Sequence, residues 1–419
     1  MLMRVHAGRP SGGGDVRDPA TNGRRSAGGP GRAWFVVLGL AVLVAGRGPA
    51  GIVAGAAPTE AAISAEVRQT WIGYKSDFIQ PDGEVREVDS HQATSEGQAY
   101  AMLRAVWSGD RDAFDSVWRW TQSHLQVRGD ALFSWLWGPD QSTRPMLLGS
   151  GSATDADEDI ALALIFAGHR WHDSRYVDSA RAVLADIWRK EVAQLQGDYY
   201  LTAGDWAPEG PEGPVLNPSY FEPYAYPVFA QEDRGHPWNA LVASSYRALQ
   251  RCSSATLDQR SSVGLPPNWC VLDGTDGSAK PFNGPGPASG YGYDAFRVMW
   301  RVALDYQWNR SPQARSYLER SGYLREQWQS QGRLLSLYRH DGLPDRGATE
   351  DATIYAGDIG NFLVTDSGAA DSILRGKLLS SYRRRPGGAY WGDRFNYFQQ
   401  NWIWFGVALA AHQLVDLAS

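Results

Sequence analysis

The sequence predicts an all-α domain built as a double ring of about twelve paired helices. About twelve segments show the periodicity of amphipathic or buried helices. The strand-like segments, at residues 85–88 and 199–202, are short, and no alternation of strands and helices typical of a parallel sheet is visible. The predicted helices cover residues 60–80, 95–108, 111–126, 155–169, 173–194, 221–231, 237–251, 294–308, 311–332, 351–363, 369–381 and 397–416.

Three long segments rich in Gly and Pro interrupt these helices. They cover residues 203–218, 253–268 and 273–292. Long loops inside a compact domain commonly carry function, so we expect these segments to lie over a cleft. No linker or run of charge divides the chain after residue 57. Residues 58–419 are therefore predicted to form one domain.

Residues 1–57 have a different composition. Gly, Ala, Arg and Pro dominate as far as Arg32, and residues 33–45 then form the apolar run AWFVVLGLAVLVA. A basic region, a short apolar core and the small residues 54–57 are typical of a secretory signal. The apolar run is too short to predict a membrane span. We expect an exported protein, periplasmic or secreted, with cleavage near Ala57; an uncleaved N-terminal anchor is the alternative.

The charge of the chain is unevenly distributed. The leader holds seven Arg and two Asp, a formal charge of +5, so the charge of −6 on the whole chain leaves −11 on the remaining residues. A domain this acidic is a poor candidate for binding nucleic acid or anionic lipid. We therefore expect no nucleic acid partner, and no membrane contact beyond the signal segment.

The chain has only two cysteines, Cys252 and Cys270. In an exported protein, a disulfide between them is the favoured interpretation. Two unpaired thiols are the alternative.

The most informative stretch is ATDADEDIALALIFAGHRW, at residues 153–171. Thr154 is the predicted N-cap, with Asp157 in the capping-box position. Asp155 would then lie in the first helical turn and share a face with Asp159, four residues on. Acidic residues in a first turn complement the helix dipole and need no further role. The helix that follows, however, is apolar nearly all round and therefore buried, which favours a functional role for these carboxylates.

Two further acidic residues begin apolar helices. In HQATSEGQAYAMLRAVW, Ser95 and Gln98 form a predicted capping box that puts Glu96 at the first helical position. Asp294 follows a Gly-rich loop, with Arg297 one turn on as a possible ion-pair partner. If these helices run in parallel in an inner ring, three carboxylates converge at one end.

Two carboxylates on either side of a bond are what glycoside hydrolysis requires, one as a proton donor and one to activate water or attack the sugar. A calcium loop in the DxDxD run is excluded, because Ile160 and Phe166 stand where Gly and Glu are needed. Other metal, nucleotide and serine-hydrolase motifs are absent from the sequence. We predict no cofactor and no metal.

These segments resemble those of glycoside hydrolase family 8. The stretch at 153–171 resembles the signature of the family, and SEGQAYAM and YGYDAFRV resemble two other catalytic segments in the same order. LNPSYFEP, at 216–223, resembles a fourth. The resemblance covers residues 60–415 and implies an (α/α)6 barrel that hydrolyses glycosidic bonds with inversion. The two carboxyls of such enzymes stand roughly 6.5–9.5 Å apart.

The resemblance also implies roles for individual residues. Glu96 matches the general acid, Asp294 the general base, and Asp155 the aspartate that holds a distorted sugar at the cleavage point. Tyr220, Arg297 and Tyr397 match positions near that sugar. Eighteen Trp and nineteen Tyr are available for stacking on sugars or for the core. Trp135 and Trp137 are candidates for sugar stacking, with core packing as an equal alternative.

Within the family, residues 236–249 and 264–269 are similar to segments of endoglucanases that accompany bacterial cellulose synthesis. The resemblance therefore implies a β-1,4-glucan chain as substrate and a functional link to the cellulose synthase machinery. Other family members cut xylan, chitosan or mixed-linkage glucan, and these substrates stay open. A non-catalytic glycan-binding barrel is the alternative from another class of protein, and a polysaccharide lyase is a further one.

Overall fold

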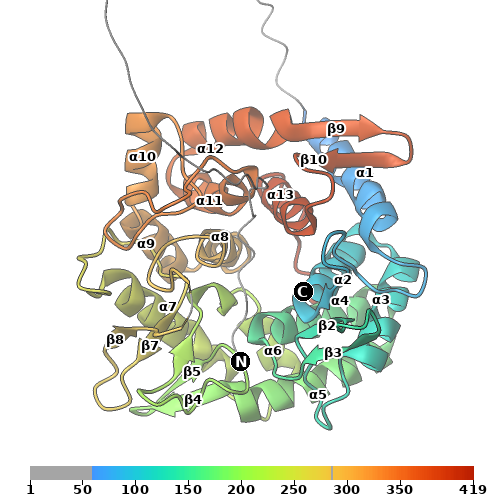
Figure 1. Cartoon of the computed structure of the whole chain (residues 1–419), viewed down its shortest axis with the longest axis horizontal. Coiled ribbons are helices and arrows are strands. Elements are labelled where there is room, and N and C mark those ends of the chain that lie inside the picture. The colour runs from blue at the N-terminus through green and yellow to red at the C-terminus, as the bar shows by residue number, and fades with distance from the viewer. Residues whose placement is uncertain (1–58, 285) are drawn as a thin grey trace, which may run out of the picture. The chain divides into compact units, whose positions relative to one another are not determined.

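The computed structural model describes residues 59–284 and 286–419, and residues 59–419 form one compact unit. Helices of this unit form an inner ring (Figure 1). Around the ring α2 packs on α4, α8 on α11, and α11 on α13. The inner helices are α2 (Ser95–Ser108), α4 (Thr154–Trp171), α6 (Tyr226–Glu232), α8 (Arg297–Asn309), α11 (Ala352–Thr365) and α13 (Tyr397–Ala410).

The remaining helices of the described chain form an outer layer (Figure 1). Inner and outer helices alternate along the chain, except that the outer helices α9 and α10 follow one another; α3 packs on α2, α5 on α4 and α9 on α8. This arrangement is the predicted (α/α)6 barrel. The outer helices are α1 (Glu60–Phe78), α3 (Arg111–His124), α5 (Ser174–Glu191), α7 (Trp238–Ser254), α9 (Pro312–Arg320), α10 (Tyr323–Gln331) and α12 (Ser367–Ile373).

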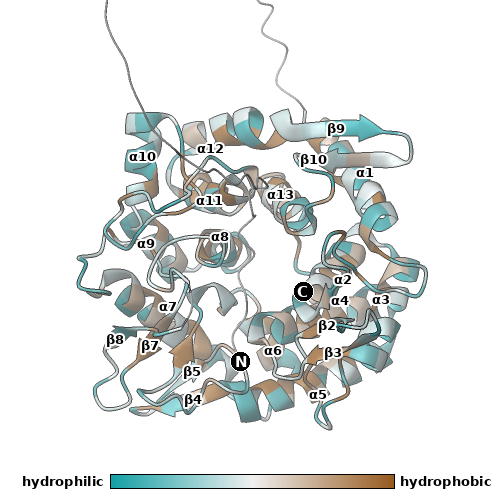
Figure 2. Cartoon of the chain, viewed as in Figure 1, coloured by the Kyte–Doolittle hydropathy of each residue, from teal (hydrophilic) through white to brown (hydrophobic). Residues whose placement is uncertain are grey.

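The two layers differ in how their residues are buried. In α4 every residue from Thr154 to Gly168 is buried, as expected for a helix that is apolar nearly all round. The outer helix α5 buries one stripe and exposes hydrophilic residues along its other side (Figure 2). The sequence patterns therefore predicted both the helices and the layer of α4.

Some predicted helices have different bounds in the structure. The predicted helix 311–332 is two helices, α9 and α10, separated at Ser321 and Gly322. The side chains of Asn361 and Arg325 donate to the carbonyl of Leu318 at 2.9 and 3.0 Å, so the end of α9 finds partners outside its own helix.

The helix predicted at 221–231 begins only at Tyr226. Pro227 lies in the first turn of α6, where proline is favoured because its missing N–H leaves no helical bond unmade. The helix predicted at 369–381 ends as α12 at Ile373 and continues as a π-helical segment, Leu374–Leu378.

Short antiparallel strands connect the helices and occupy the long loops. Strands β6, β7 and β8 form one sheet; β6 and β8 lie within segments predicted as loops, and β7 lies between two of these segments. Strand β5 overlaps the strand predicted at 199–202. Residues 85–88 contribute only an isolated bridge, between Ile79 and Val85. The strands are β1 (Ala93–Thr94), β2 (Leu136–Pro139), β3 (Pro145–Gly149), β4 (Val192–Leu195), β5 (Asp198–Leu201), β6 (Val215–Leu216), β7 (Cys270–Leu272), β8 (Ala279–Pro281), β9 (Tyr382–Arg385) and β10 (Gly388–Trp391).

The cysteines form the favoured disulfide, between Cys252 near the end of α7 and Cys270 at the start of β7. The bond joins the outer layer to the sheet β6–β7–β8. We expect the double variant Cys252→Ser, Cys270→Ser to lower the free energy of unfolding by about 3 kcal/mol, because the bridge restricts the unfolded chain. Urea unfolding checks this, with reductant-treated wild type as the matched control. An unchanged midpoint would contradict it.

A buried acid in the inner ring predicts a pH dependence of stability. Asp358, in α11, accepts a hydrogen bond from the Tyr291 hydroxyl, and burial raises its pKa to about 8. Between the ordinary value of 3.8 and about 8, the folded state keeps a proton that the unfolded state loses. The free energy of unfolding therefore falls as pH rises through this window.

Asp358→Asn cannot lose that proton, so we expect a smaller fall between pH 5 and pH 8, measured by urea unfolding at each pH. Asp371→Asn, at an exposed site on α12, is the control and should keep the wild-type slope. An equal slope in all three proteins would show that Asp358 does not hold this proton.

The predicted leader and secretion signal, residues 1–57, lie outside the described residues. Within the described part of the chain, none of the helices has both the length and the apolar character that crossing a bilayer requires.

Candidate active site

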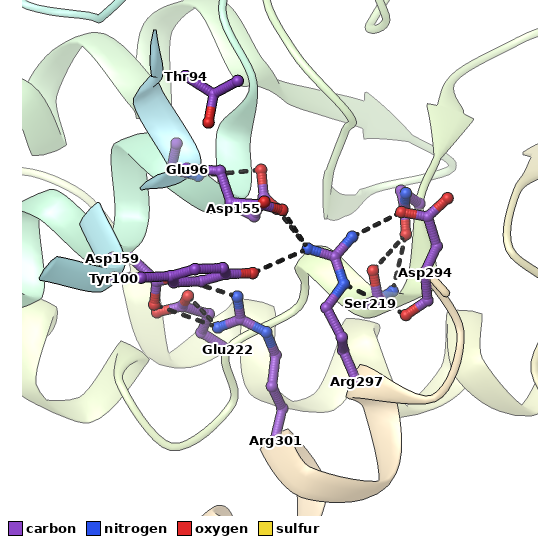
Figure 3. A network of polar contacts seen from close by, with 12 residues as sticks. Thr94, Glu96, Tyr100, Asp155, Asp159, Ser219, Glu222, Asp294, Arg297 and Arg301 are labelled. Atoms are coloured by element: carbon purple, nitrogen blue, oxygen red, sulfur yellow. Dashed lines mark hydrogen bonds and ion pairs between the residues drawn. The ribbon is translucent and has the colours of Figure 1, made fainter. Parts of the chain in front are cut away.

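Three carboxylates meet at the guanidinium of Arg297, the first residue of α8 (Figure 3). Its Nη1 lies 3.0 Å from Glu96 Oε2 and 2.8 Å from Asp155 Oδ2, and its Nη2 lies 2.6 Å from Asp294 Oδ1. Arg297 is itself only 1% exposed. The structure therefore brings together the three acids that the sequence singled out.

The side chains of this site come from the starts of the inner helices. Glu96 and Asp155 lie in the first turns of α2 and α4, and Tyr397 is the first residue of α13. Because the starts of α2, α4, α8 and α13 lie at the same end of the barrel, side chains distant in sequence reach one point. This is the convergence expected for parallel inner helices.

The local caps differ from the predicted ones by one residue. Thr94, rather than Ser95, caps α2, and its hydroxyl accepts a hydrogen bond from the Gly97 amide at 3.0 Å. Gln98 does not close a capping box; its side-chain oxygen accepts from the Val85 amide and thereby fixes the chain before α2. This buried hydrogen bond to a distant residue outweighs the local one.

The predicted cap of α4 is also wrong. Thr154 is the first helical residue, and Ala153 is the N-cap without a side-chain bond. Asp157, expected to complete a capping box, instead accepts from the Phe133 amide at 2.9 Å. Asp155 still lies in the first turn, so its predicted position holds.

The predicted helix at 294–308 begins three residues late. Asp294 lies in a turn before α8, and Arg297 opens the helix. The predicted ion pair between them is present, and the Arg297 Nε also lies 3.3 Å from the Asp294 carbonyl oxygen.

The surroundings of Glu96 raise its pKa to near neutral pH. Burial raises the pKa of Glu96 to about 7 against the lowering effect of the Arg297 charge, and Asp155 contributes further to the rise. The Tyr397 hydroxyl donates to Glu96 Oε1 at 3.0 Å. The Glu96 side chain nevertheless keeps 22% of its surface exposed. A partly exposed carboxyl with this pKa can donate a proton to a bound molecule.

Asp155 is more enclosed than the other two acids, with 2% of its side chain exposed. Burial raises its pKa, while the charges of Arg297 and Arg301 act in the opposite direction. Asp294 has 26% of its side chain exposed, so it is open to solvent in a way that Asp155 is not.

A second arginine, Arg301, lies one helical turn after Arg297 on α8 and pairs with a second group of acids. Arg301 pairs with Asp159 at 3.2 Å and with Glu222, and it donates to the Tyr224 hydroxyl at 2.9 Å. Arg297 and Arg301 are four residues apart on α8, as Asp155 and Asp159 are on α4. The facing pairs hold α4 and α8 in register (Figure 3).

The predicted aromatic residues have different environments. Tyr220 is buried, with its ring 5.3 Å from the Arg297 guanidinium. Trp137 packs against Trp120 and the His124 ring, which favours its core alternative. Trp135 is half-buried, and its carbonyl accepts from the Ser95 amide at 3.1 Å, next to Glu96.

Sequence reasoning missed two aromatic side chains. Trp269 donates from its indole nitrogen to Asp294 Oδ2 at 3.1 Å. The ring of Trp206, which is 48% exposed, lies 6.3 Å from the ring of Trp269. Trp206 lies in a long Gly- and Pro-rich segment, and Trp269 ends the segment 264–269; these positions were the signals that could have drawn attention to them.

Arginines supply the positive charge at this site. Among residues 59–284 and 286–419, no group of three or more His, Cys, Asp or Glu side chains could hold a metal ion. Arg297 and Arg301 occupy the centres of the two carboxylate clusters.

The protein is thus an all-α double-ring barrel with a cluster of acids at the starts of its inner helices. Residues 49–323 match the model of the glycosyl hydrolases family 8, and the chain belongs to this family. The chain is similar to Endoglucanase A of Acetivibrio thermocellus, with 33% identity over 263 residues, covering 60% of this chain and 51% of that protein. It is 32% identical over 251 residues to the Endoglucanase of Escherichia coli K12, covering 57% and 64%. Each match thus spans between half and two thirds of the relative.

Solved structures share the fold. The endo-β-1,4-glucanase CMCax from Acetobacter xylinum superposes with a TM-score of 0.65 at 21% identity, covering 84% of this chain and 99% of that one. A β-1,3-1,4-glucanase from Paenibacillus sp. X4 gives 0.70 at 21% identity, covering 84% and 93%. A reducing end xylose-releasing exo-oligoxylanase gives 0.67 at 21% identity, covering 85% and 93%.

Proposed function

We propose that this chain is an inverting endo-β-1,4-glucanase that hydrolyses internal bonds of a cellulose-type glucan. The observation that carries the proposal is the pairing of two different carboxyls through Arg297. Glu96 has its pKa raised to about 7, and Asp294 is held as the partner of an arginine. Two carboxyls in different environments are what the division into acid and base requires.

The proposed reaction uses one water molecule for each bond cut. Glu96 donates its proton to the glycosidic oxygen, and the bond from that oxygen to the anomeric carbon breaks. Water attacks the anomeric carbon from the opposite face, and Asp294 accepts the proton that the water loses. Asp155, fixed by Arg297, holds the distorted sugar between them. The products are a new reducing end and a new free hydroxyl.

The geometry is compatible with inversion. The two nitrogens of Arg297 that contact Glu96 and Asp294 are bonded to one carbon, so the contacted oxygens lie no more than about 8 Å apart. Separations up to this limit include the roughly 5–5.5 Å of retaining enzymes and the lower part of the roughly 6.5–9.5 Å of inverting ones. The choice of inversion therefore rests on the resemblance to family 8.

A same-family hydrolase acting on another glycan is the second candidate. Structures with this fold include a β-1,3-1,4-glucanase and a xylose-releasing exo-oligoxylanase. The names of the curated relatives, which are endoglucanases, favour the glucan.

We also propose that the protein is exported to the periplasm or beyond and acts alongside cellulose synthesis. The composition of the leader supports export. The similarity of residues 236–249 and 264–269 to segments of endoglucanases that accompany cellulose synthesis supports the link. Immunoblotting of cell fractions tests the first part, and accumulation of the chain only in the cytoplasm would overturn it.

The test of function is the release of reducing ends from carboxymethylcellulose, with xylan, chitosan and lichenan in parallel. Wild type is compared with Glu96→Gln. Cleavage of cellulose that is lost in the variant supports the proposal, and NMR of the first product should show the α-anomer. Cleavage of another glycan alone overturns the substrate but keeps the reaction. No cleavage by a folded wild type favours a glycan-binding barrel.

A further inference from the structure

We propose that Trp269 is a positioning residue for the base Asp294, and that the Cys252–Cys270 disulfide holds Trp269 in place. The inference rests on the proposed function, in which Asp294 accepts a proton from water. It assigns a role to a tryptophan that is bonded to Asp294 and to the disulfide at the neighbouring residue.

Both carboxylate oxygens of Asp294 accept hydrogen bonds. Its Oδ2 accepts from the Trp269 indole N–H at 3.1 Å, and its Oδ1 accepts from Arg297 at 2.6 Å. Each oxygen therefore has one donor, and the two donors come from different parts of the chain. Two donors on opposite oxygens restrict rotation of the carboxylate. A carboxylate offers about four lone-pair sites, so it can still accept a proton from water.

Hydrogen bonds attach Trp269 and its neighbour Asn268 to the loop that carries Asp294. The Asn268 and Trp269 amides donate to the carbonyls of Gly290 and Ala288 at 2.7 and 2.8 Å. The Asn268 side-chain oxygen accepts from the amide of Ala295, next to Asp294, at 3.0 Å. The two segments therefore move as one unit.

A disulfide anchors the residue next to Trp269. Cys270 directly follows Trp269 and is bonded to Cys252 on the outer helix α7. Backbone pairing holds Cys270 opposite Leu216 and Pro281 in the sheet β6–β7–β8. A covalent bond at the neighbouring residue limits how far the Trp269 backbone can shift relative to the barrel.

An alternative role for Trp269 is stacking on a sugar. Its ring lies among other aromatic rings, 6.0 Å from Tyr220 and 5.5 Å from Phe282. Stacking would act on substrate binding, whereas positioning of the base acts on the chemical step. The two roles are therefore separated by whether KM or kcat changes.

The experiment starts with Trp269→Phe, which keeps an aromatic ring and removes the N–H donor. We expect kcat to fall about tenfold to a hundredfold, as for the loss of a hydrogen bond to a charged group, with KM nearly unchanged. Trp188→Phe is the matched control, because Trp188 lies on α5 and packs on Trp238 away from the acids. Unchanged kcat in Trp269→Phe, or a rise in KM alone, would overturn the proposal.

The disulfide is tested in the same assay. The variant Cys252→Ser, Cys270→Ser should lower kcat severalfold at a temperature where circular dichroism shows it folded. Combined with Trp269→Phe, it should add little, because both changes act through Asp294. Effects that multiply independently would show that the disulfide does not act through Trp269.

Failure of the proposed function and failure of this inference give different results. If wild type cleaves none of the glycans, the proposed function fails, and a crystal structure of Trp269→Phe decides the inference. A displaced Asp294 carboxylate would support positioning by Trp269, and an unmoved one would overturn it.

Discussion

Glu96→Gln is expected to lower kcat on cellulose-type glucan by about 10³-fold, within the range of general acid catalysis. Glutamine has nearly the shape of glutamic acid, and its oxygen can still accept from Tyr397, so the fold and KM should change little. It cannot donate a proton to the glycosidic oxygen. Release of reducing ends under saturating substrate gives kcat, and circular dichroism checks the fold.

The size of this loss should depend on the leaving group. A nitrophenyl cello-oligosaccharide carries a leaving group that departs without protonation, so the variant should recover most of its activity on it. Glu319→Gln, at an exposed site on α9, is the control and should match wild type on both substrates. Equal losses on both substrates would remove Glu96 from the role of acid.

The pH dependence of kcat/KM provides a second test of Glu96 as the acid. Because the pKa of Glu96 is raised to about 7, the proton stays on below that pH and is lost above it. We therefore expect kcat/KM of the wild type to fall as pH rises through about 7. Glu96→Gln should lack this fall, since its side chain does not titrate.

Asp294→Asn is expected to lower kcat by a similar factor of about 10³, because the attacking water loses its proton acceptor. The asparagine oxygen can still accept from Arg297, but its amide nitrogen then faces the Trp269 N–H, so this variant also loses the hydrogen bond from Trp269. Unlike Glu96→Gln, this variant should stay inactive on the nitrophenyl substrate, since water must be activated whatever group leaves. Initial rates on both substrates measure the contrast.

Asp371→Asn, at an exposed site on α12, controls for the loss of one carboxylate. Recovery of Asp294→Asn on the nitrophenyl substrate would show that Asp294 acts on the leaving group instead. Near-normal activity of Asp294→Asn on the polymer would show that Asp294 is not the base.

The sequence predicted the acid cluster from local patterns. Glu96, Asp155 and Asp294 each stand at or just before the start of an apolar helix, and the barrel places those starts together. The caps were misjudged by one residue because Gln98 and Asp157 bond to Val85 and Phe133, which local patterns cannot identify. The same reason hid the contact of Trp269 with Asp294, which joins residues 25 positions apart.

By itself the sequence determined where most helices lie, the burial of α4 and the placement of acids at helix starts, because periodicity and helix position are properties of neighbouring residues. Only the tertiary structure decided which cation joins the acids and which acid keeps a proton. Arg297 contacts Glu96 across 201 positions of sequence and Asp155 across 142. Burial and charge at Glu96 come from these distant side chains, and they set its pKa.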